Sequence, residues 1–212
     1  MKKFDTSLYF ITDSTGLEEN MFLNIVEQAL SGGVTIIQIR EKDKSTREYM
    51  HLAEKVHEIS AKYGVPLIVD DRIDVALAVN TEGVHLGRSD MPVNTARKIL
   101  GDSMIIGATA KNVEQALEAV KNGADYLGVG AVYPTTTKVK TVLTSVDTLK
   151  DICHAVSVPV NAIGGLNKDN CHILAGTGIA GLCVVSAIMK SSNPKTSAAE
   201  LKAVSERLKL SV

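Results

Sequence analysis

The chain has 212 residues, with 23 Lys and Arg against 24 Asp and Glu, so its formal net charge is -1. This balance excludes a global positive field that would collect nucleic acid or an anionic membrane surface, and any phosphate binding must be local. The length predicts one large core and one domain over residues 1–212.

The three cysteines are Cys153, Cys171 and Cys183, an odd number with no C-x-x-C pair. This pattern argues against a disulfide framework and a zinc site, and it favours a reducing compartment. The segment from Met1 to Ser14 holds two lysines and a short apolar run, too short for a signal peptide or a membrane span. We therefore expect a cytoplasmic protein with no membrane and no nucleic-acid partner.

Eight short β-rich runs recur along the chain, with helix-length segments between them. Most are almost continuously apolar, as expected when both faces of a parallel sheet are covered. They predict strands at Leu8–Thr12, Ile36–Arg40, Pro66–Val69, Gly83–Leu86, Met104–Ala108, Tyr126–Val129, Pro159–Ala162 and Gly181–Val185. So many β/α units in so short a chain favour an α/β fold closed into a single (β/α)8 TIM barrel over a doubly wound open sheet.

Helix start and stop signals between the strands agree with this interpretation. Ser45 and Glu48 form a capping-box pattern, and Gly64 suits a left-handed stop before the third strand. The same signals predict a helix from Asn112 and Gln115 to Gly123, a shorter one from Pro92 to about Gly101, and a last one over about Ala198–Leu208.

The end of the second strand carries an amide and two cations. In TIM barrels the reactive groups collect at the C-terminal ends of the strands. Strand alternation places Gln38, Arg40 and Lys42 on one side, with Ile39 and Glu41 on the other. The first set suits a polyanion, because Arg40 can grip two phosphate oxygens and Lys42 adds a mobile charge. The alternative is an exposed charged loop.

Carboxylates follow the next two strands. Asp70 and Asp71 come directly after the third strand, before Arg72, and Asp90 lies in the loop after the fourth. Neighbouring strand ends lie side by side, and converging carboxylates need a positive partner, for which Mg²⁺ is the common choice. In the alternative, Asp70 or Asp71 pairs with Arg72, and Asp90 caps the helix that begins near Pro92.

The segment after the sixth strand is rich in hydroxyl groups. Gly128 and Gly130 allow a close backbone approach, Thr135–Thr137 offer donors and acceptors, and Lys138 can neutralise a leaving group. Threonine clusters also occur as plain turns or β-edges. A proline-led cluster ending in lysine at a barrel rim favours a functional interpretation.

The remaining strand ends predict a phosphate site and little else. Gly164 and Gly165 follow the seventh strand and Ser186 follows the eighth, where TIM barrels often bind a phosphate monoester through backbone N–H groups. The Thr109 side chain, after the fifth strand, could simply form hydrogen bonds with the backbone of its own turn. His85 is expected to be a hydrogen-bonded core histidine rather than an acid or base.

No set of residues with the pattern of a nucleophile and its base stands out in the sequence. Cys183, the cysteine within a strand, is expected to be buried and inert.

Together these segments resemble the thiamine-phosphate synthase family over essentially the whole chain. The resemblance rests on motifs in the right order: 38–42, 71–78, 83–87, 134–138, 162–165 and 185–186. It implies transfer of a hydroxymethylpyrimidine group from its diphosphate to the ring nitrogen of a thiazole phosphate, which gives thiamine phosphate and pyrophosphate. The implied mechanism is dissociative: pyrophosphate leaves, a pyrimidine carbocation forms, and the thiazole nitrogen captures it.

The resemblance also implies roles for individual residues and two small phosphorylated substrates as partners. The pyrimidine diphosphate would be held by Gln38, Ile39, Arg40, Glu41, Lys42, Asp70, Thr109 and Lys138. The thiazole phosphate would be held by Thr135, Thr136, Thr137, Gly165, Val185 and Ser186. One Mg²⁺ per active site would be bound by Asp71 and Asp90, and Lys138, Arg40 and Thr109 would be catalytic. A homo-oligomer is left open.

Three residues depart from the family pattern, and two rival functions stay open. The family usually has Asn at Asp70, Ser at Thr109 and Gln at Arg88. A thiazole tautomerase of the related barrel family would lack the threonine–lysine loop and the metal carboxylates. A silent phosphate-binding barrel would need only Gly164, Gly165 and Ser186, and would leave the charged strand ends unexplained.

Overall fold

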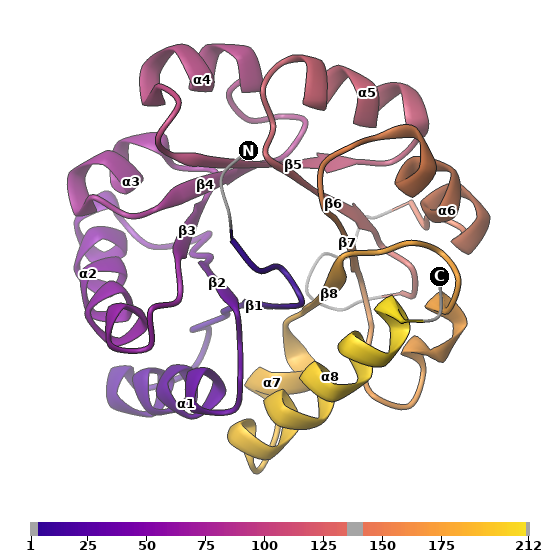
Figure 1. Ribbon diagram of the computed structural model, residues 1–212. Helices are drawn as coiled ribbons and strands as arrows, with labels where there is room; N and C mark the ends of the chain where they lie inside the picture. The colour runs from indigo at the N-terminus through magenta and orange to yellow at the C-terminus, as the bar shows by residue number, and fades with distance from the viewer. Residues whose placement is uncertain (1–3, 135–141, 211–212) are drawn as a thin grey trace.

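The computed structural model describes residues 4–134 and 142–210. Parallel strands close into a barrel in chain order, with β1 paired to both β2 and β8 (Figure 1). The strands are β1 Leu8–Ile11, β2 Ile36–Ile39, β3 Leu67–Asp70, β4 Gly83–Leu86, β5 Ile105–Ala110, β6 Tyr126–Gly130, β7 Val160–Ile163 and β8 Gly181–Val184. Closure confirms the predicted TIM barrel and excludes the open sheet.

Helices form a ring around the barrel (Figure 1). They are α1 Glu19–Ser31, α2 Thr46–Lys62, α3 Ile73–Val79, α4 Val93–Leu100, α5 Val113–Lys121, α6 Val146–Ala155, α7 Ser186–Met189 and α8 Pro194–Lys209, with a 3-10 helix, η1 Cys171–Leu174, after β7. Their apolar faces and the outward strand residues form one large buried cluster. In the part of the chain that the structure describes, every helix is too short or too polar to cross a membrane.

The predicted helix signals are confirmed where they act through hydrogen bonds. The Ser45 hydroxyl accepts from the Glu48 amide, and the Glu48 carboxylate accepts from the Ser45 amide at 2.9 Å, which completes a capping box. The Asn112 side chain accepts from the Gln115 amide at the start of α5. The predicted glycine stops have left-handed φ angles, with +64° at Gly64.

Most strand boundaries differ from the prediction by one or two residues, and two differences matter for the argument. The last helix begins at Pro194, four residues before Ala198, because the Asn193 side chain caps it by accepting from the Thr196 amide at 3.0 Å. β3 ends one residue later than expected, so Asp70 is its last residue. This shift makes Asp70 part of the sheet and fixes its direction.

The barrel interior is filled by alternate residues of the strands. Its apolar cluster consists of Tyr9, Ile11, Ile36, Ile68, Ile105, Tyr126 and Cys183. The ring of Tyr126 occupies space that Gly107 leaves, since a Cβ at Gly107 would lie 2.1 Å from the Tyr126 Cζ atom. A large residue on β6 therefore requires a glycine on the neighbouring strand.

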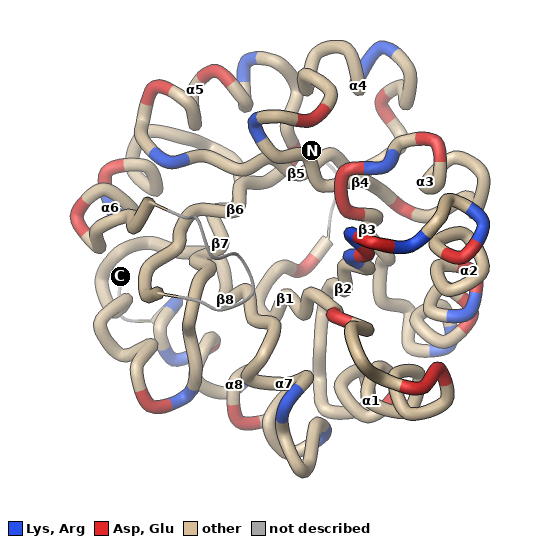
Figure 2. Tube along the Cα trace, turned by 180° about the vertical axis from the view of Figure 1, so that it is seen from behind, with Lys and Arg blue, Asp and Glu red and all other residues tan. Residues whose placement is uncertain are grey.

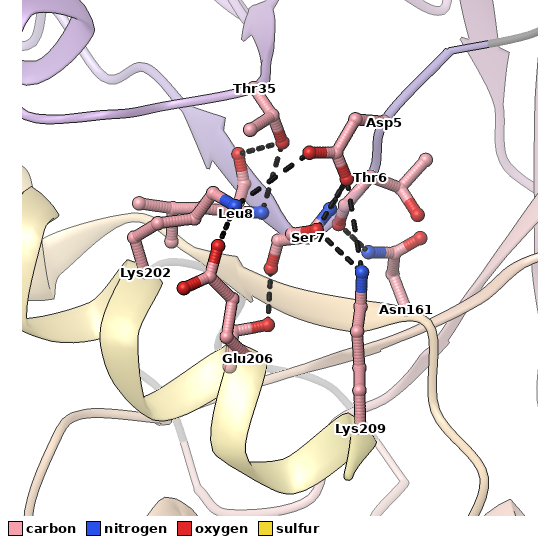
Figure 3. A network of polar contacts seen from close by, with 10 residues as sticks. Asp5, Thr6, Ser7, Leu8, Thr35, Asn161, Lys202, Glu206 and Lys209 are labelled. Atoms are coloured by element: carbon pink, nitrogen blue, oxygen red, sulfur yellow. Dashed lines mark hydrogen bonds and ion pairs between the residues drawn. The ribbon is translucent and has the colours of Figure 1, made fainter.

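The segment before β1 ties the N-terminal end of the barrel to α8 (Figure 3). Ser205 donates to the Ser7 carbonyl at 2.5 Å, and Lys202 lies 3.7 Å from the Asp5 carboxylate. Inside the barrel, Asn161 donates to the Thr6 carbonyl at 2.6 Å. These bonds support the β8–β1 closure at the end opposite to the predicted site.

The close contact at Gly107 predicts a specific loss of stability. Gly107→Ala should lower the free energy of unfolding by about 2–3 kcal/mol, because the added methyl group overlaps the Tyr126 ring. Gly64→Ala is the control: a Cβ there meets open space, and only the left-handed backbone costs about 1 kcal/mol. Urea unfolding measures both, and equal losses would contradict this account of the interior.

Candidate active site

A cavity of about 530 Å³ opens at the C-terminal ends of the strands. All eight strands, or the loops that follow them, contribute to its wall. Ten predicted site residues line it: Gln38, Arg40, Lys42, Asp70, Asp71, Asp90, Thr109, Gly165, Val185 and Ser186. Thr135, Thr136, Thr137 and Lys138, which were also predicted, lie outside the described residues.

Two predicted substrate contacts point away from the cavity. Ile39 belongs to the outer apolar cluster, and the Glu41 carboxylate accepts from the Ser14 hydroxyl at 2.7 Å. Neither side chain lines the cavity, whereas Gln38, Arg40 and Lys42 do. The predicted alternation after β2 is confirmed, and a substrate contact at Ile39 or Glu41 would have to use the backbone.

Arg40, Lys42 and Asp70 form a cluster of ion pairs in the cavity wall. Asp70 lies 3.0 Å from the Lys42 Nζ atom and 3.7 Å from the Arg40 Nε atom, and Lys42 also pairs with Asp71. Asp70 is 8% exposed. Burial and the neighbouring charge of Asp71 raise the pKa of Asp70 to about 6. The positive charges of Arg40 and Lys42 therefore compensate the negative charge of Asp70 only in part.

Asp71 and Asp90 meet at the same corner. Asp71 has a left-handed φ of 62°, and its amide donates to the His85 carbonyl at 2.9 Å, which holds the turn after β3. Asp90 accepts from the Gly87 amide at 2.7 Å. Partial burial and its hydrogen bond with Asp71 raise the pKa of Asp90. The contact with Asp71 thus disfavours the charged form of Asp90, and a cation between the two carboxyl groups would favour it.

Both structural alternatives for these carboxylates are wrong. Arg72 pairs with Asp74 and donates to the Thr46 hydroxyl at 2.9 Å, so it leaves Asp70 and Asp71 to the cavity. Asp90 folds back on Gly87, and α4 begins at Val93, with Pro92 at the N-cap position and no side-chain cap. Neither Arg72 nor the start of α4 therefore takes up the carboxylates of Asp70, Asp71 and Asp90.

The donor set at Asp71 and Asp90 fits Mg²⁺. Within residues 4–134 and 142–210, no three His, Cys, Asp or Glu side chains are grouped to hold a metal ion. Mg²⁺ does not need such a group, because it binds through one or two carboxylates and completes its shell with water and substrate phosphates. Two hard oxygen donors in mutual contact meet that requirement, whereas Zn²⁺ would need nitrogen or sulfur ligands.

A chain of hydrogen bonds crosses the barrel beneath these charges. Gln38 donates to the Tyr9 hydroxyl at 2.6 Å, and Tyr9 lies 2.6 Å from the Tyr126 hydroxyl. The His85 Nδ1 atom lies 3.1 Å from Tyr126, and its Nε2 atom lies 3.0 Å from the Thr109 hydroxyl. The predicted hydrogen bonds of His85 are confirmed, but its side chain is half-buried and lines the cavity instead of lying in the core.

Lys111 is a cavity residue that the sequence interpretation missed. It follows β5, and its Nζ atom donates to the Gly130 carbonyl and, at 3.0 Å, to the Val142 carbonyl. It thus binds the segments on either side of the threonine–lysine loop. The missed signal was its position two residues after Thr109, which puts both on the inward side, as with Arg40 and Lys42.

The glycine pair after β7 supports the segment that leaves β6. Gly164 and Gly165 have φ angles of 106° and 63°, and a Cβ at Gly164 would lie 2.3 Å from the Ala131 Cβ atom. The Tyr133 amide donates to the Gly164 carbonyl at 3.0 Å. The start of the predicted threonine loop therefore lies directly on the wall formed after β7.

Charged positions gather on the β2–β4 side of the barrel mouth, and the β6–β8 side carries few (Figure 2). The cavity wall on that second side is built mainly from apolar and glycine residues, from Gly130 and Ala131 to Gly164, Gly165 and Val184. The cavity thus has one highly charged half and one half that offers mostly backbone groups.

The family model described as thiamine monophosphate synthase matches residues 8–188. Thiamine-phosphate synthases of Methanobrevibacter smithii and Clostridium tetani are 49% and 44% identical to the chain, over 95% and 94% of it and 96% of each relative. The chain belongs to the thiamine monophosphate synthase family. It is therefore an alkyl-transferring enzyme of thiamine biosynthesis.

Solved structures of known proteins agree with this family and fold. A thiamine phosphate pyrophosphorylase from Pyrococcus furiosus has a TM-score of 0.86 at 40% identity, covering 95% of this chain and 96% of its own. A 3-hexulose-6-phosphate synthase has a TM-score of 0.71 at 15% identity, which shows a shared fold alone. Membership of the thiamine monophosphate synthase family therefore rests on sequence as well as on the barrel.

The cysteines of this family member should be unreactive, which tests the prediction for Cys183. Burial raises the pKa of Cys153 to about 11 and also raises those of Cys171 and Cys183. At pH 8 roughly one Cys153 in a thousand is a thiolate. Native protein should react slowly with a thiol-specific disulfide reagent, whereas protein in guanidinium should titrate three thiols. Rapid reaction of any thiol in the native protein would refute this expectation.

Proposed function

We propose that the enzyme transfers the hydroxymethylpyrimidine group of 4-amino-2-methyl-5-hydroxymethylpyrimidine diphosphate to 4-methyl-5-(2-phosphoethyl)thiazole. The products would be thiamine phosphate and pyrophosphate. The observation that carries the proposal is the meeting of the Asp71–Asp90 carboxyl pair with Arg40 and Lys42 in one corner of the cavity. That corner suits a diphosphate with one Mg²⁺, in a chain whose relatives are named thiamine-phosphate synthase.

The charged half of the cavity would hold the pyrimidine diphosphate. Arg40 presents a planar fork and Lys42 a point charge, and both would bind oxygens of the diphosphate. Asp71 and Asp90 would hold Mg²⁺, and when bound that ion would supply positive charge to the departing pyrophosphate. Thr109 and Gln38 would contact the pyrimidine from the cavity floor.

Asp70 occupies the two cations that the diphosphate would bind. Without substrate its carboxylate pairs with both Arg40 and Lys42, the cations that the diphosphate would use. Its raised pKa means that its charged form is poorly stabilised there. A bound diphosphate would therefore displace Asp70 from the cations or find it protonated.

The half that offers backbone groups would hold the thiazole phosphate. Gly165, Val185 and Ser186 line the cavity where β7 and β8 end, and α7 begins at Ser186. A phosphate monoester can bind there through backbone N–H groups and the Ser186 hydroxyl. Thr135–Thr137 and Lys138 are proposed to contribute as the family resemblance implies.

The proposed reaction is dissociative. The bond between the methylene carbon and the diphosphate oxygen breaks, and its electron pair leaves with pyrophosphate. The thiazole nitrogen then donates its lone pair to the pyrimidine carbocation and forms the new C–N bond. Two features support this order: cations are abundant, and Cys183, the thiol in the described cavity wall, has a pKa raised well above its usual value and stays neutral.

The related tautomerase activity and the silent barrel are less well supported. Neither would need the carboxyl pair at Asp71 and Asp90 or the cations Arg40 and Lys42, all of which converge on the cavity. The relative 51% identical from Streptococcus pneumoniae serotype 4 is named thiamine-phosphate synthase 2. The synthase proposal accounts for all of these features together.

The direct test is product formation. Purified protein incubated with both phosphorylated precursors and Mg²⁺ should give thiamine phosphate and pyrophosphate, separated by chromatography. Replacing Mg²⁺ with EDTA should suppress both products, because the carboxyl pair then carries no cation. No coupled product in either condition would sink the transferase proposal, and full activity in EDTA would sink its metal requirement.

The three neighbouring carboxylates should differ in their effect on turnover. Asp71→Ala and Asp90→Ala should each lower kcat/KM by roughly 100-fold or more, because each removes a proposed Mg²⁺ ligand. Asp70→Asn should cost less than about 10-fold, since it frees Arg40 and Lys42 for the diphosphate.

Asp74→Asn is the matched control for this series. Asp74 is an exposed carboxylate of the same segment that pairs with Arg72 and does not line the cavity. Its kcat/KM should stay within about twofold of the wild-type value. Equal losses for Asp70, Asp71 and Asp90 variants would refute the division of roles.

A further inference from the structure

The hydrogen-bond chain beneath the charged corner joins two buried tyrosine hydroxyl groups. Tyr9 and Tyr126 are 1% and 0% exposed, and their rings meet edge to face with centroids 5.6 Å apart. A buried hydroxyl group needs hydrogen-bond partners. Among the described residues, the Tyr9 hydroxyl contacts Gln38 and Tyr126, and the Tyr126 hydroxyl contacts Tyr9 and His85.

With the Gln38 amide nitrogen toward Tyr9, as the structure places it, the proton of each group in this chain has one consistent place. Gln38 donates its amide hydrogen to Tyr9, so the Tyr9 oxygen accepts and its own proton is available to Tyr126. Tyr126 then accepts from Tyr9 and donates to the His85 Nδ1 atom. A neutral histidine that accepts at Nδ1 carries its proton on Nε2, which lies 3.0 Å from the Thr109 hydroxyl.

With Gln38 as the donor to Tyr9, the opposite direction fits less well. If Tyr126 donated to Tyr9, the Tyr9 oxygen would accept two protons, from Gln38 and from Tyr126. The Tyr9 proton would then need another acceptor, and the structure gives Tyr9 no third partner within the described residues. An unsatisfied buried hydroxyl group costs about 1–3 kcal/mol.

Two glycines make room for the chain, which indicates that the surrounding strands are built around it. A Cβ at Gly107 would lie 2.1 Å from the Tyr126 Cζ atom and 2.3 Å from its hydroxyl oxygen. A Cβ at Gly128 would lie 3.2 Å from the His85 Cε1 atom. A side chain at Gly107 would overlap the Tyr126 ring and hydroxyl group, and one at Gly128 would crowd the His85 ring.

We propose that Tyr9, Tyr126 and His85 are positioning residues that form a one-way hydrogen-bond chain between Gln38 and Thr109. The chain holds the Gln38 carboxamide with its nitrogen turned inward, so its oxygen faces the cavity as an acceptor. His85 donates to the Thr109 oxygen, which frees the Thr109 proton to be donated to a ligand. The cavity floor thus presents a fixed acceptor on the β2 side and a fixed donor on the β5 side.

This pattern selects a planar heterocycle that offers a donor to Gln38 and an acceptor to Thr109. An amino-substituted pyrimidine has both groups, an exocyclic amine and unprotonated ring nitrogens. The assignment of this ligand class rests on the proposed function, whereas the direction of the chain rests on the orientation of the Gln38 amide and the contacts that follow from it. The two can therefore be tested separately.

The direction is measured by the tautomer of His85. Long-range ¹H–¹⁵N correlation spectra of ¹⁵N-labelled protein at pH 8 distinguish a ring protonated on Nε2, on Nδ1 or on both. The chain has five histidines, and the spectrum of a His85→Gln variant assigns the signals of His85 by their loss. We expect a neutral ring with its proton on Nε2 in the ligand-free protein. A proton on Nδ1, or a doubly protonated ring, would overturn the proposal.

A variant and a matched control separate positioning from packing. Tyr126→Phe keeps the ring but removes the proton that Nδ1 accepts, so the Nδ1 resonance should move to higher frequency. Tyr49→Phe should leave it in place, because Tyr49 is equally buried but donates to the backbone carbonyls of Ile39 and Asp70. An unchanged Nδ1 resonance in Tyr126→Phe would refute the proposed bond.

Kinetics test the functional consequence. Tyr9→Phe and Tyr126→Phe should each lower kcat/KM for the pyrimidine diphosphate by roughly 5–10-fold, and the double variant should lose little more, because both break one chain. The KM for the thiazole phosphate should not change. Additive losses would count against a single chain. If the protein made no thiamine phosphate but His85 carried its proton on Nε2, the proposed function would fail and the proposed hydrogen-bond chain would stand.

Discussion

The alternation of side chains along short strands in a closed barrel governs the rest of this molecule. Each strand places every second residue inside, and closure brings the inward residues of distant strands within hydrogen-bond distance. Tyr9 and Tyr126 lie 117 positions apart in the sequence and share a hydrogen bond of 2.6 Å. The same alternation puts Arg40 and Lys42 on the cavity wall and sends Glu41 toward Ser14.

Local patterns in the sequence were enough to predict the barrel and much of its charged corner. Apolar runs, caps and glycine stops are properties of neighbouring residues, and the structure agrees with them closely. Asp71 and Asp90 could be placed together because consecutive parallel strands are neighbours in such barrels. Arg40 and Lys42 could be placed by alternation within one segment. Each of these inferences needed only one strand or one pair of adjacent strands.

The features that the sequence did not reveal depend on register and closure. Asp70 reaches Arg40 and Lys42 because β3 runs one residue longer than predicted and β2 pairs with it at Ile39 and Val69. Tyr9 and Tyr126 read as ordinary members of apolar strands, and only the closed barrel brings their hydroxyl groups together. No pattern within a single segment carries the contact between Tyr9 and Tyr126, because β1 and β6 are not consecutive in the sequence.

The residues that fill the barrel interior beneath the cavity strengthen the electrostatic interactions of the charged corner. Ile36, Ile68 and Ile105 belong to the apolar cluster of the interior, Tyr9 and Tyr126 join that cluster to His85 by hydrogen bonds, and the ionised groups line the cavity at the mouth. Asp70 is buried beside this interior, where charges are poorly screened, and its pKa is raised to about 6. The same weak screening would strengthen the attraction of Arg40 and Lys42 for a departing pyrophosphate. A floor of mobile water would weaken both effects, so the satisfied hydroxyl groups of Tyr9 and Tyr126 support the electrostatics above them without touching the charges.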